Sequence, residues 1–413
     1  MLILVANLGS TSFKYKLLDV SGDLTADVRP DDRVLARGAV ERIGDASTSR
    51  CEVTIGDYHH VSEMPVPDHG VAVQACLDQL TDPEHGCLKD AAEVSAIGFK
   101  AVHGGRKSGT FLVDDEVLEA MAEMNAAAPA HNPPYIAAMT LLRERFPNLP
   151  LVAAFETEFH DTIPEARRAY ATPPGWRENY QVQKWGFHGS SHRYIAERAA
   201  ELLGRTDARI ISCHLGGSSS LTAIQNGHSV MTTMGMTPQT GLPQNNRVGD
   251  FDPFALPLLM QRSGKSLDEL LGELASQGGL KGISEKSGDL RDIESAAASG
   301  DAKSQLALDV YVEEIRRHMG GMIVAMGGVD AIVFTGGIGE NSDVVRSAVC
   351  KNLGSLGIEL DEQRNSNHRG SLPPENANKG EGYLQTENSR TQIWVIPTNE
   401  EWIVAKRTLG VLS

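Results

Sequence analysis

The chain has 413 residues, of which 41% are apolar and 22% are charged. This composition is typical of a soluble globular protein. The length is too great for one ordinary hydrophobic core, so we expect two domains. The formal net charge of −16 argues against non-specific binding to nucleic acid or to an anionic membrane, because both partners are negatively charged. A local basic pocket for an anionic substrate remains compatible with this charge.

Two further features of the composition favour a cytoplasmic location. The apolar start at 2–6 lacks the length and the basic flank of a signal peptide, and no segment approaches the ~18 uncharged apolar residues of a membrane helix. The five cysteines are scattered without Cys-x-x-Cys spacing, which is typical of reduced thiols that pack in or near the core. We therefore expect neither a membrane anchor nor a disulfide framework.

A strand–turn–strand pattern occurs twice along the chain. The first copy spans 2–17 and contains the small-residue turn 7–12, and the second spans 209–224 and contains the turn 214–220. Asn226-Gly227 follows the second copy and predicts a hairpin turn. The copies lie about half the chain length apart, which suggests a duplicated fold with two facing halves and a cleft between them. Chance similarity of two glycine- and serine-rich turns is the alternative.

Helices and strands alternate in the rest of the chain. Apolar residues recur at three- and four-residue spacing over 304–326, which predicts a long amphipathic helix before a buried strand at 330–334. Further helices are expected at 254–260, 267–274 and 342–353, and further strands at 151–155 and 393–396. This alternation is typical of the α/β class. The polar stretch 366–390 is expected to be a surface excursion.

Three turns rich in glycine and hydroxyl side chains follow strands, at 7–12, 214–220 and 335–341. Such turns let backbone N–H groups and hydroxyls approach phosphate oxygens closely. None has the GxxxxGK[ST] pattern of a Walker A loop. Each alone could be a plain tight turn, but three of them in a duplicated fold indicate a nucleotide site.

Histidines and carboxylates supply candidate polar groups. His103, His131 and His188 lie beside glycine or proline residues that restrict the backbone, which suits a positioned donor. No spacing typical of a zinc site is present. Glu156 and Glu400 each follow a predicted strand, where a carboxylate can hold Mg²⁺ through oxygen or can be a solvated turn residue.

Eight motifs together resemble the acetokinases, a branch of the sugar kinase, Hsp70 and actin superfamily. They lie in the family's order and cover essentially the whole chain: NLGSTSFKYKLLD at 7–19, AVHGG at 101–105, HNPP at 131–134, GFHGSSHRY at 186–194, GDFDP at 249–253, LKGISEKSGDLRDI at 280–293, FTGGIGENS at 334–342 and IPTNEE at 396–401. The resemblance implies two ribonuclease-H-like domains of the actin-like ATPase fold, with an interdomain cleft. We expect an N-terminal acetokinase domain at 1–155 plus 401–413 and a nucleotide-binding domain at 156–400.

The resemblance also implies an activity. It is the transfer of the γ-phosphoryl group of ATP to a small carboxylic acid, most simply acetate, with Mg²⁺ or alternatively Mn²⁺, in a homodimer. The alternatives are a kinase for propionate, butyrate or another small carboxylate, a non-catalytic ATP-binding protein on the same fold, and a kinase with pyrophosphate as donor. The first reading agrees with the chemistry, because a carboxylate is ionised at pH 7 and its phosphorylation needs positioning and positive charge more than a base.

Site residues are carried over from the family motifs one by one. The catalytic set is Lys100, Glu156, His188 and Arg247. The acid is expected to contact Lys100, Val102, His131, Phe187, Pro238 and Arg247. The expected metal site comprises Asn7, Glu156 and Glu400. The expected nucleotide site comprises Asn7, Ser10, Ser12, Lys14, His214, Gly216, Gly217, Asp289, Leu290, Arg291, Gly337, Ile338, Gly339 and Asn341.

The sequence departs from the family pattern within this site. Lys100 replaces the usual arginine and keeps its charge without the bidentate fork, and Glu156 replaces the usual aspartate. Gly217 replaces an asparagine, Ala130 replaces a leucine, and Glu158 adds a negative charge. Two hypotheses follow: Lys100 and Glu156 form a co-adjusted pair, and Ala130 widens the acyl pocket for an acid larger than acetate.

Overall fold

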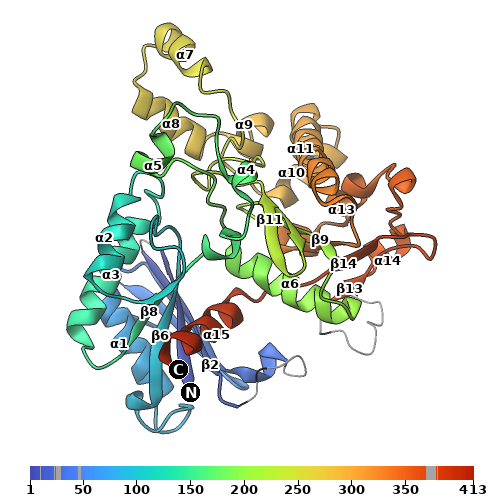
Figure 1. The fold of residues 1–413 in the computed structure, drawn as a ribbon. Coiled ribbons are helices and arrows are strands. Elements are labelled where there is room, and N and C mark those ends of the chain that lie inside the picture. The colour runs from blue at the N-terminus through green and yellow to red at the C-terminus, as the bar shows by residue number, and fades with distance from the viewer. Residues whose placement is uncertain (10, 23, 25–28, 45–47, 369–377, 379) are drawn as a thin grey trace. The chain divides into compact units, whose positions relative to one another are not determined.

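The chain divides into two units, which we describe separately from a computed structural model (Figure 1). The first unit comprises Met1–Glu158 with Asn399–Ser413, and the second comprises Phe159–Thr398. The boundaries expected from the sequence lay at 155 and 401. The structure describes residues 1–413 except 10, 23, 25–28, 45–47, 369–377 and 379. No helix within the described part of the chain is long and apolar enough to cross a membrane.

The first unit is built on an eight-stranded sheet with the order β5-β4-β3-β2-β1-β6-β8-β7. Its strands are β1 (Leu2–Gly9), β2 (Ser12–Asp19), β3 (Val34–Glu41), β4 (Ser49–Ile55), β5 (Tyr58–Met64), β6 (Val94–Ala101), β7 (Thr110–Leu112) and β8 (Leu151–Phe155). The strands β1, β6 and β8 run parallel, and the others pair antiparallel with their neighbours. The carboxyl ends of β1, β6 and β8 therefore lie together at one edge.

Helices cover both faces of this sheet. They are α1 (His69–Leu80), α2 (Asp115–Glu123), α3 (Asn132–Arg145) and α15 (Glu400–Leu412), with the short 3₁₀ helices η1 (Pro30–Arg33), η2 (Ala91–Glu93) and η3 (Glu158–His160), the last of which crosses the unit boundary. One face forms a core in which Leu4, Ala6 and Leu8 of β1 pack with apolar residues of α1 and α3. The C-terminal helix α15 packs on β1, β6 and β8.

A glycine in β6 allows α15 to approach the sheet. A Cβ atom at Gly98 would lie 2.4 Å from the Thr408 hydroxyl oxygen and 3.2 Å from a Val404 methyl carbon. Both of these side chains belong to α15 and are buried. The strand can therefore carry no side chain at this position without moving the helix.

The second unit repeats the central strand pattern of the first. Its sheet has the order β11-β10-β9-β12-β14-β13. Its strands are β9 (Arg209–His214), β10 (Ser220–Gln225), β11 (His228–Thr232), β12 (Ala331–Thr335), β13 (Gly382–Tyr383) and β14 (Gln392–Val395). In both units an antiparallel three-stranded meander (β1–β3 or β9–β11) is continued by two parallel strands beside its first strand. This shared topology confirms the predicted duplication and the α/β class.

The helices of the second unit include the long amphipathic helix that the sequence predicted. They are α4 (Glu165–Arg168), α5 (Trp176–Tyr180), α6 (Gly189–Leu203), α7 (Ala255–Ser263), α8 (Leu267–Ser276), α9 (Gly279–Ser284), α10 (Leu290–Ala298), α11 (Ala302–Met326), α12 (Gly336–Asn341), α13 (Asp343–Cys350) and α14 (Glu362–Ser366), with η4 (Gly354–Leu356). The side chain of Asp301 caps the start of α11, and Gly327 ends it with a φ of 70°. Its apolar stripe, including Ile315 and Met319, lies in the core of the unit.

Three local predictions were wrong in detail. The run 335–341 was expected to be a turn but mostly forms helix α12, and the amides of Ile338 and Gly339 donate to the Leu215 carbonyl. Most of 7–12 belongs to β1 and β2. The stretch 366–390 is not wholly a surface excursion: Glu381 is buried because Arg198 pairs with it at 2.8 Å. Residues 369–377 and 379 lie outside the described part.

Replacing Gly98 with valine should lower the free energy of unfolding by about 1–3 kcal/mol, because the new side chain overlaps Thr408 and Val404. Urea denaturation measures the change. Gly410→Ala is the matched control on the exposed part of α15, where an added Cβ meets nothing within 4 Å. Equal stability of Gly98→Val and wild type would contradict the close packing of α15 on β6.

Candidate active site

A group of charged side chains lies at the carboxyl edge of the first sheet. Lys100 stands near the end of β6, Glu156 directly follows β8, and Glu400 begins α15. The Lys100 ammonium donates to Glu400 Oε2 at 2.7 Å. The two side chains are 20% and 16% exposed, and Glu156 is 4% exposed. Three elements far apart in sequence thus place one cation and two carboxylates in a largely buried region.

The charge of Lys100 is stabilised by these carboxylates. Burial alone would lower the pKa of Lys100, but the negative charges of Glu400 and Glu156 outweigh burial and raise the pKa above its ordinary value. Lys100 therefore remains an ammonium ion throughout the physiological pH range. Lys100 was expected to act with Glu156, and the structure adds a hydrogen bond from Lys100 to Glu400.

Asn7 is held beside this group by a tyrosine that the sequence analysis did not single out. The Tyr135 hydroxyl donates to Asn7 Oδ1 at 3.2 Å and accepts from the Leu8 amide at 3.1 Å. Burial raises the pKa of Tyr135 to about 12, so the phenol keeps its proton. Tyr135 directly follows the HNPP motif, and its place in that run was the only available signal.

The donor set of the first unit fits a hard divalent cation. The side chains of Asn7, Glu156 and Glu400 offer amide and carboxylate oxygens, which Mg²⁺ prefers. Among the residues that the structure describes, no group of three or more His, Cys, Asp or Glu side chains forms a metal cage. Mg²⁺ is usually bound by one or two carboxylates with substrate phosphates and water, so two carboxylates and an amide suffice.

The additional negative charge of Glu158 is compensated by an arginine. Its carboxylate pairs with Arg407 of α15. Arg407 also donates to the carbonyls of Phe155 at 3.2 Å and Gly109 at 2.9 Å, so it ties α15 to the end of β8 directly before Glu156.

In the second unit, His188 stands at a strained position before α6. Its φ is 57° and its ψ is 30°, in the left-handed region that a side chain rarely adopts. Its ring stacks on that of His214 with centroids 4.3 Å apart. Its Nδ1 atom lies 2.8 Å from the Ser220 hydroxyl. The strained backbone and these two contacts hold the ring in one orientation.

His192 supports this arrangement from inside the unit. Its two ring nitrogens lie 2.8 Å from the Ser212 hydroxyl and 2.9 Å from the Ser220 hydroxyl. Burial, together with nearby His160 and His214, holds the pKa of His192 well below 6.5, so the ring is neutral. Ser220 consequently links a neutral, fully buried histidine to His188. Neither His192 nor Ser220 was among the site residues predicted from the sequence, although His192 lies in the motif GFHGSSHRY at 186–194.

Arg247 is oriented by a buried glutamine. Its Nη1 atom donates to Gln244 Oε1 at 3.2 Å, and Gln244 Nε2 donates to the Pro238 carbonyl at 2.8 Å. Burial lowers the pKa of Arg247, but a guanidinium with a reference pKa above 12 remains charged. Gln244 lies three residues before Arg247 in the sequence and links two of the predicted acid-binding residues, Arg247 and Pro238. Phe187, a third, is buried, and its carbonyl contacts His160 Nε2 at 2.9 Å.

A pocket of about 530 Å³ collects most of the residues predicted for adenosine and phosphate. It is lined by Gly216, Gly217, Asn245, Asp289, Leu290, Arg291, Glu294, Gly337, Ile338, Asn341 and Ser342. Two of the predicted residues in the second unit do not line it. Gly339 is buried and its carbonyl accepts from Arg346, and His214 Nδ1 contacts the Ser191 hydroxyl at 2.8 Å.

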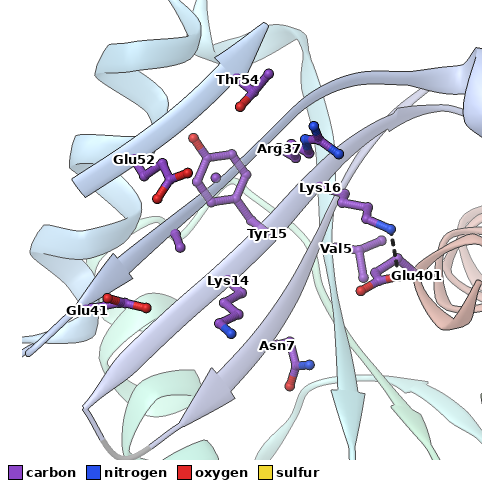
Figure 2. Close-up of a pocket in the computed structure, with 12 residues that line it drawn as sticks. Val5, Asn7, Lys14, Tyr15, Lys16, Arg37, Glu41, Glu52, Thr54 and Glu401 are labelled. Carbon is purple, nitrogen blue, oxygen red and sulfur yellow. Dashed lines mark hydrogen bonds and ion pairs between the residues drawn. The ribbon is translucent and has the colours of Figure 1, made fainter. Parts of the chain in front are cut away.

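The other predicted nucleotide residues belong to the first unit. Asn7 and Lys14 line a pocket of about 350 Å³ on the face of the sheet, and Lys14 is exposed there (Figure 2). Ser12 begins β2, and Ser10 lies outside the described residues. Among the acid-binding candidates, Val102 and His131 are half-buried in the first unit, whereas Phe187 and Pro238 are buried in the second.

Comparison with known proteins identifies the family. The model of the acetokinase family matches residues 2–406. The chain belongs to this family. It is 41% identical over 412 residues to the acetate kinase of Clostridium kluyveri, covering 99% of this chain and 97% of that protein. It is 42% identical over 416 residues to the acetate kinase of Carboxydothermus hydrogenoformans, covering 100% and 99%.

Solved structures of an acetate kinase and a propionate kinase are similar to this chain. The crystal structure of Porphyromonas gingivalis acetate kinase has a TM-score of 0.86 at 36% identity and covers 100% of both chains. That of a propionate kinase from Francisella tularensis has a TM-score of 0.86 at 32% identity and covers 98% of each. The acetokinase family and its two-domain actin-like ATPase fold, expected from the motifs, are therefore confirmed.

The buried histidines predict a loss of stability in acid. The pKa of His160 is lowered to about 4, mainly by burial, so His160 binds a proton in the unfolded chain before it does so in the native one. The contribution of neutral His160 to the free energy of unfolding is fully present above about pH 6.5. It decreases by about 1.4 kcal/mol per pH unit as the pH falls from there toward 4. Urea denaturation at several pH values should show a smaller slope for His160→Gln. The exposed control His228→Gln should keep the wild-type slope, and an unchanged slope in His160→Gln would contradict a neutral His160.

Proposed function

We propose that this protein transfers the γ-phosphoryl group of ATP to acetate and forms acetyl phosphate and ADP. The observation that carries the proposal is the relationship to acetate kinases at about 41% identity along the whole chain. The pocket of the second unit supports it, because residues from motifs at 214–220, 280–293 and 334–342 line one cavity. Carboxylate kinase activity follows from the family, whereas acetate itself is the proposal.

The second unit is proposed to bind the nucleotide. Asp289, Leu290 and Arg291 at the start of α10 would hold the adenosine with Gly337, Ile338 and Asn341 of α12. Gly216 and Gly217 would leave room for phosphate oxygens beside backbone amides, because neither carries a Cβ atom. Gly339 and His214 act indirectly in this assignment, since they hold α12 and the loop after β9. Asn7, Ser10, Ser12 and Lys14 are the proposed phosphate contacts of the first unit.

Catalysis is proposed to rest on positioned positive charge. The transition state of phosphoryl transfer is loose and carries its charge on the equatorial oxygens. Arg247 would grip the acid and the transferring group, His188 would donate a hydrogen bond to that group, and Lys100 would add its charge. The acceptor carboxylate is already ionised at neutral pH, so no residue has to remove a proton from it.

Mg²⁺ is the proposed metal, with Mn²⁺ as a substitute. Asn7, Glu156 and Glu400 would hold it through oxygen. When bound, it neutralises charge on the β- and γ-phosphate oxygens. The two carboxylates would fix the position of the ion, and the position of Glu400 is itself fixed in the first turn of α15.

The size of the acid is open to a second proposal. Val102, His131, Phe187 and Pro238 are the proposed acyl contacts. Ala130, directly before His131, replaces a leucine and is exposed. A wider pocket would favour propionate or butyrate, and a similar protein from Francisella tularensis is a propionate kinase. A non-catalytic nucleotide-binding role is the remaining alternative, which turnover excludes directly.

Acyl phosphate formed by the protein is trapped and measured as hydroxamate. With acetate, hydroxamate should form at a measurable rate, and its formation should depend on both ATP and Mg²⁺. Formate, propionate and butyrate are assayed in parallel. Nucleotide binding without hydroxamate from any acid would refute the kinase proposal.

Ala130→Leu tests the acyl pocket. If Ala130 widens it, the variant should lose about tenfold or more in kcat/KM for butyrate relative to acetate, since one or two methylene groups in an apolar pocket carry about 10- to 200-fold discrimination. A wild-type kcat/KM that falls steadily from acetate to butyrate, with no change in Ala130→Leu, would contradict the larger-acid hypothesis.

We further propose a homodimer, located in the cytoplasm. All five cysteines are free thiols, four of them buried, which suits a reducing compartment. The hairpin of α7 and α8 exposes several large apolar side chains: Phe254, Leu258, Leu259, Met260, Leu267 and Leu271. Phe254 is 86% exposed, and α7 contains no buried residue. A second copy of the chain is the proposed partner of this surface.

The dimer proposal predicts that Leu258→Glu combined with Leu271→Glu gives a monomer, because two buried charges would oppose association. Light scattering after size-exclusion chromatography measures the mass. Leu112→Glu, which changes a similarly exposed leucine in the first unit, should leave the dimer intact. A dimeric double variant would place the interface elsewhere.

A further inference from the structure

Lys100 makes its hydrogen bond to a carboxylate that is proposed to hold the metal. Its ammonium lies 2.7 Å from Glu400 Oε2, and both side chains are largely buried. The second proposed carboxylate ligand, Glu156, also acts on the charge of Lys100. One ammonium therefore neutralises part of the charge of both carboxylates.

In this arrangement Lys100 competes with a divalent cation for Glu400. A cation that binds Glu400 through the same oxygen must either displace the ammonium or remain close to a like charge, and both lower its affinity. Within the described residues no third acidic, histidine or cysteine side chain completes a cage that could compensate. The protein alone should thus bind the metal weakly, and phosphate oxygens of the nucleotide, with water, would supply the remaining ligands.

Whether residue 100 is lysine or arginine affects how freely its charged group can move once it leaves Glu400. Lysine presents a compact ammonium on a flexible stem of four carbons, whereas arginine holds a planar fork. An ammonium released from Glu400 can therefore turn toward another carboxylate.

We propose that Lys100 is an internal competitor of the divalent cation: it occupies Glu400 in the nucleotide-free protein and is released to the carboxylate of the acid when the metal arrives with the nucleotide. This inference rests on the proposed carboxylate kinase function. Metal binding and acid binding are then coupled through one side chain. The substitution of arginine by lysine at this position is what permits the exchange.

The chain offers a matched control on the same helix turn. Lys16 pairs with Glu401 at 3.0 Å, with side chains 31% and 29% exposed, and Figure 2 shows this pair on the sheet face. Both pairs join a strand to the first turn of α15. Glu401 is not a proposed metal ligand, so loss of Lys16 removes the same type of pair without freeing a proposed ligand.

The test is titration of nucleotide-free protein with Mn²⁺ alone, with free Mn²⁺ measured by electron paramagnetic resonance. Removing the competing charge in Lys100→Met should tighten Mn²⁺ binding by about tenfold or more. Lys16→Met should bind Mn²⁺ as wild type does. Lys100→Arg, whose planar fork leaves Glu400 less readily, should bind Mn²⁺ no more tightly than wild type. Adding Glu400→Gln to Lys100→Met should abolish the gain. Lys100→Gln serves as the second neutral variant if the methionine variant does not fold.

Two results would overturn the proposal. One is unchanged or weaker Mn²⁺ binding in both neutral Lys100 variants, and the other is an equal gain in Lys16→Met, which would indicate a general charge effect. Because the titration needs no turnover, it is separate from the hydroxamate assay. A protein that forms acetyl phosphate but fails the Mn²⁺ test refutes only the competitor role. Tightened binding without turnover refutes the kinase proposal, and with it the release of Lys100 to the acid, but keeps the competition between Lys100 and the metal for Glu400.

Discussion

The ion pair between Lys100 and Glu400 joins parts of the chain that are 300 residues apart. It forms because the last helix returns to the first sheet, where Gly98 lets α15 lie directly on β6. Arg407 adds a second connection from the same helix to the end of β8. Glu156 is thus fixed at the carboxyl edge beside Lys100, and the charged group of the first unit depends on this returning helix.

Neutral histidines have the corresponding role in the second unit. His192 is fully buried, and two serine hydroxyls satisfy both of its ring nitrogens, so its burial costs little in lost hydrogen bonds. Through Ser220 it reaches His188, whose strained backbone is tolerated because surrounding contacts determine it. The first unit therefore uses compensated charges, and the second uses a neutral hydrogen-bonded network, to hold side chains in place.

Much of the architecture was readable from the residues. The period of the apolar residues in α11 and the repeated strand–turn–strand pattern predicted elements that the structure contains. Local motifs also indicated residues such as Asp289 and Asn341 that line one pocket. The predictions were wrong where contacts between residues far apart in the sequence determine local structure or burial. The run expected as a turn forms α12, and the Leu215 carbonyl accepts from two of its amides, at 338 and 339. Arg198 pairs with Glu381, which is buried.

By itself, the sequence determined the family, the duplicated α/β fold and the types of side chain available for chemistry. These follow from periodicity and from motifs, which are local properties of the chain. The tertiary structure alone decided which charged side chains form ion pairs: Lys100 with Glu400, and Glu158 with Arg407. It also selected Tyr135, Gln244 and Ser220 as supports of the site. The reason is physical, because a pair energy depends on distance and burial, and both arise only when distant elements pack together.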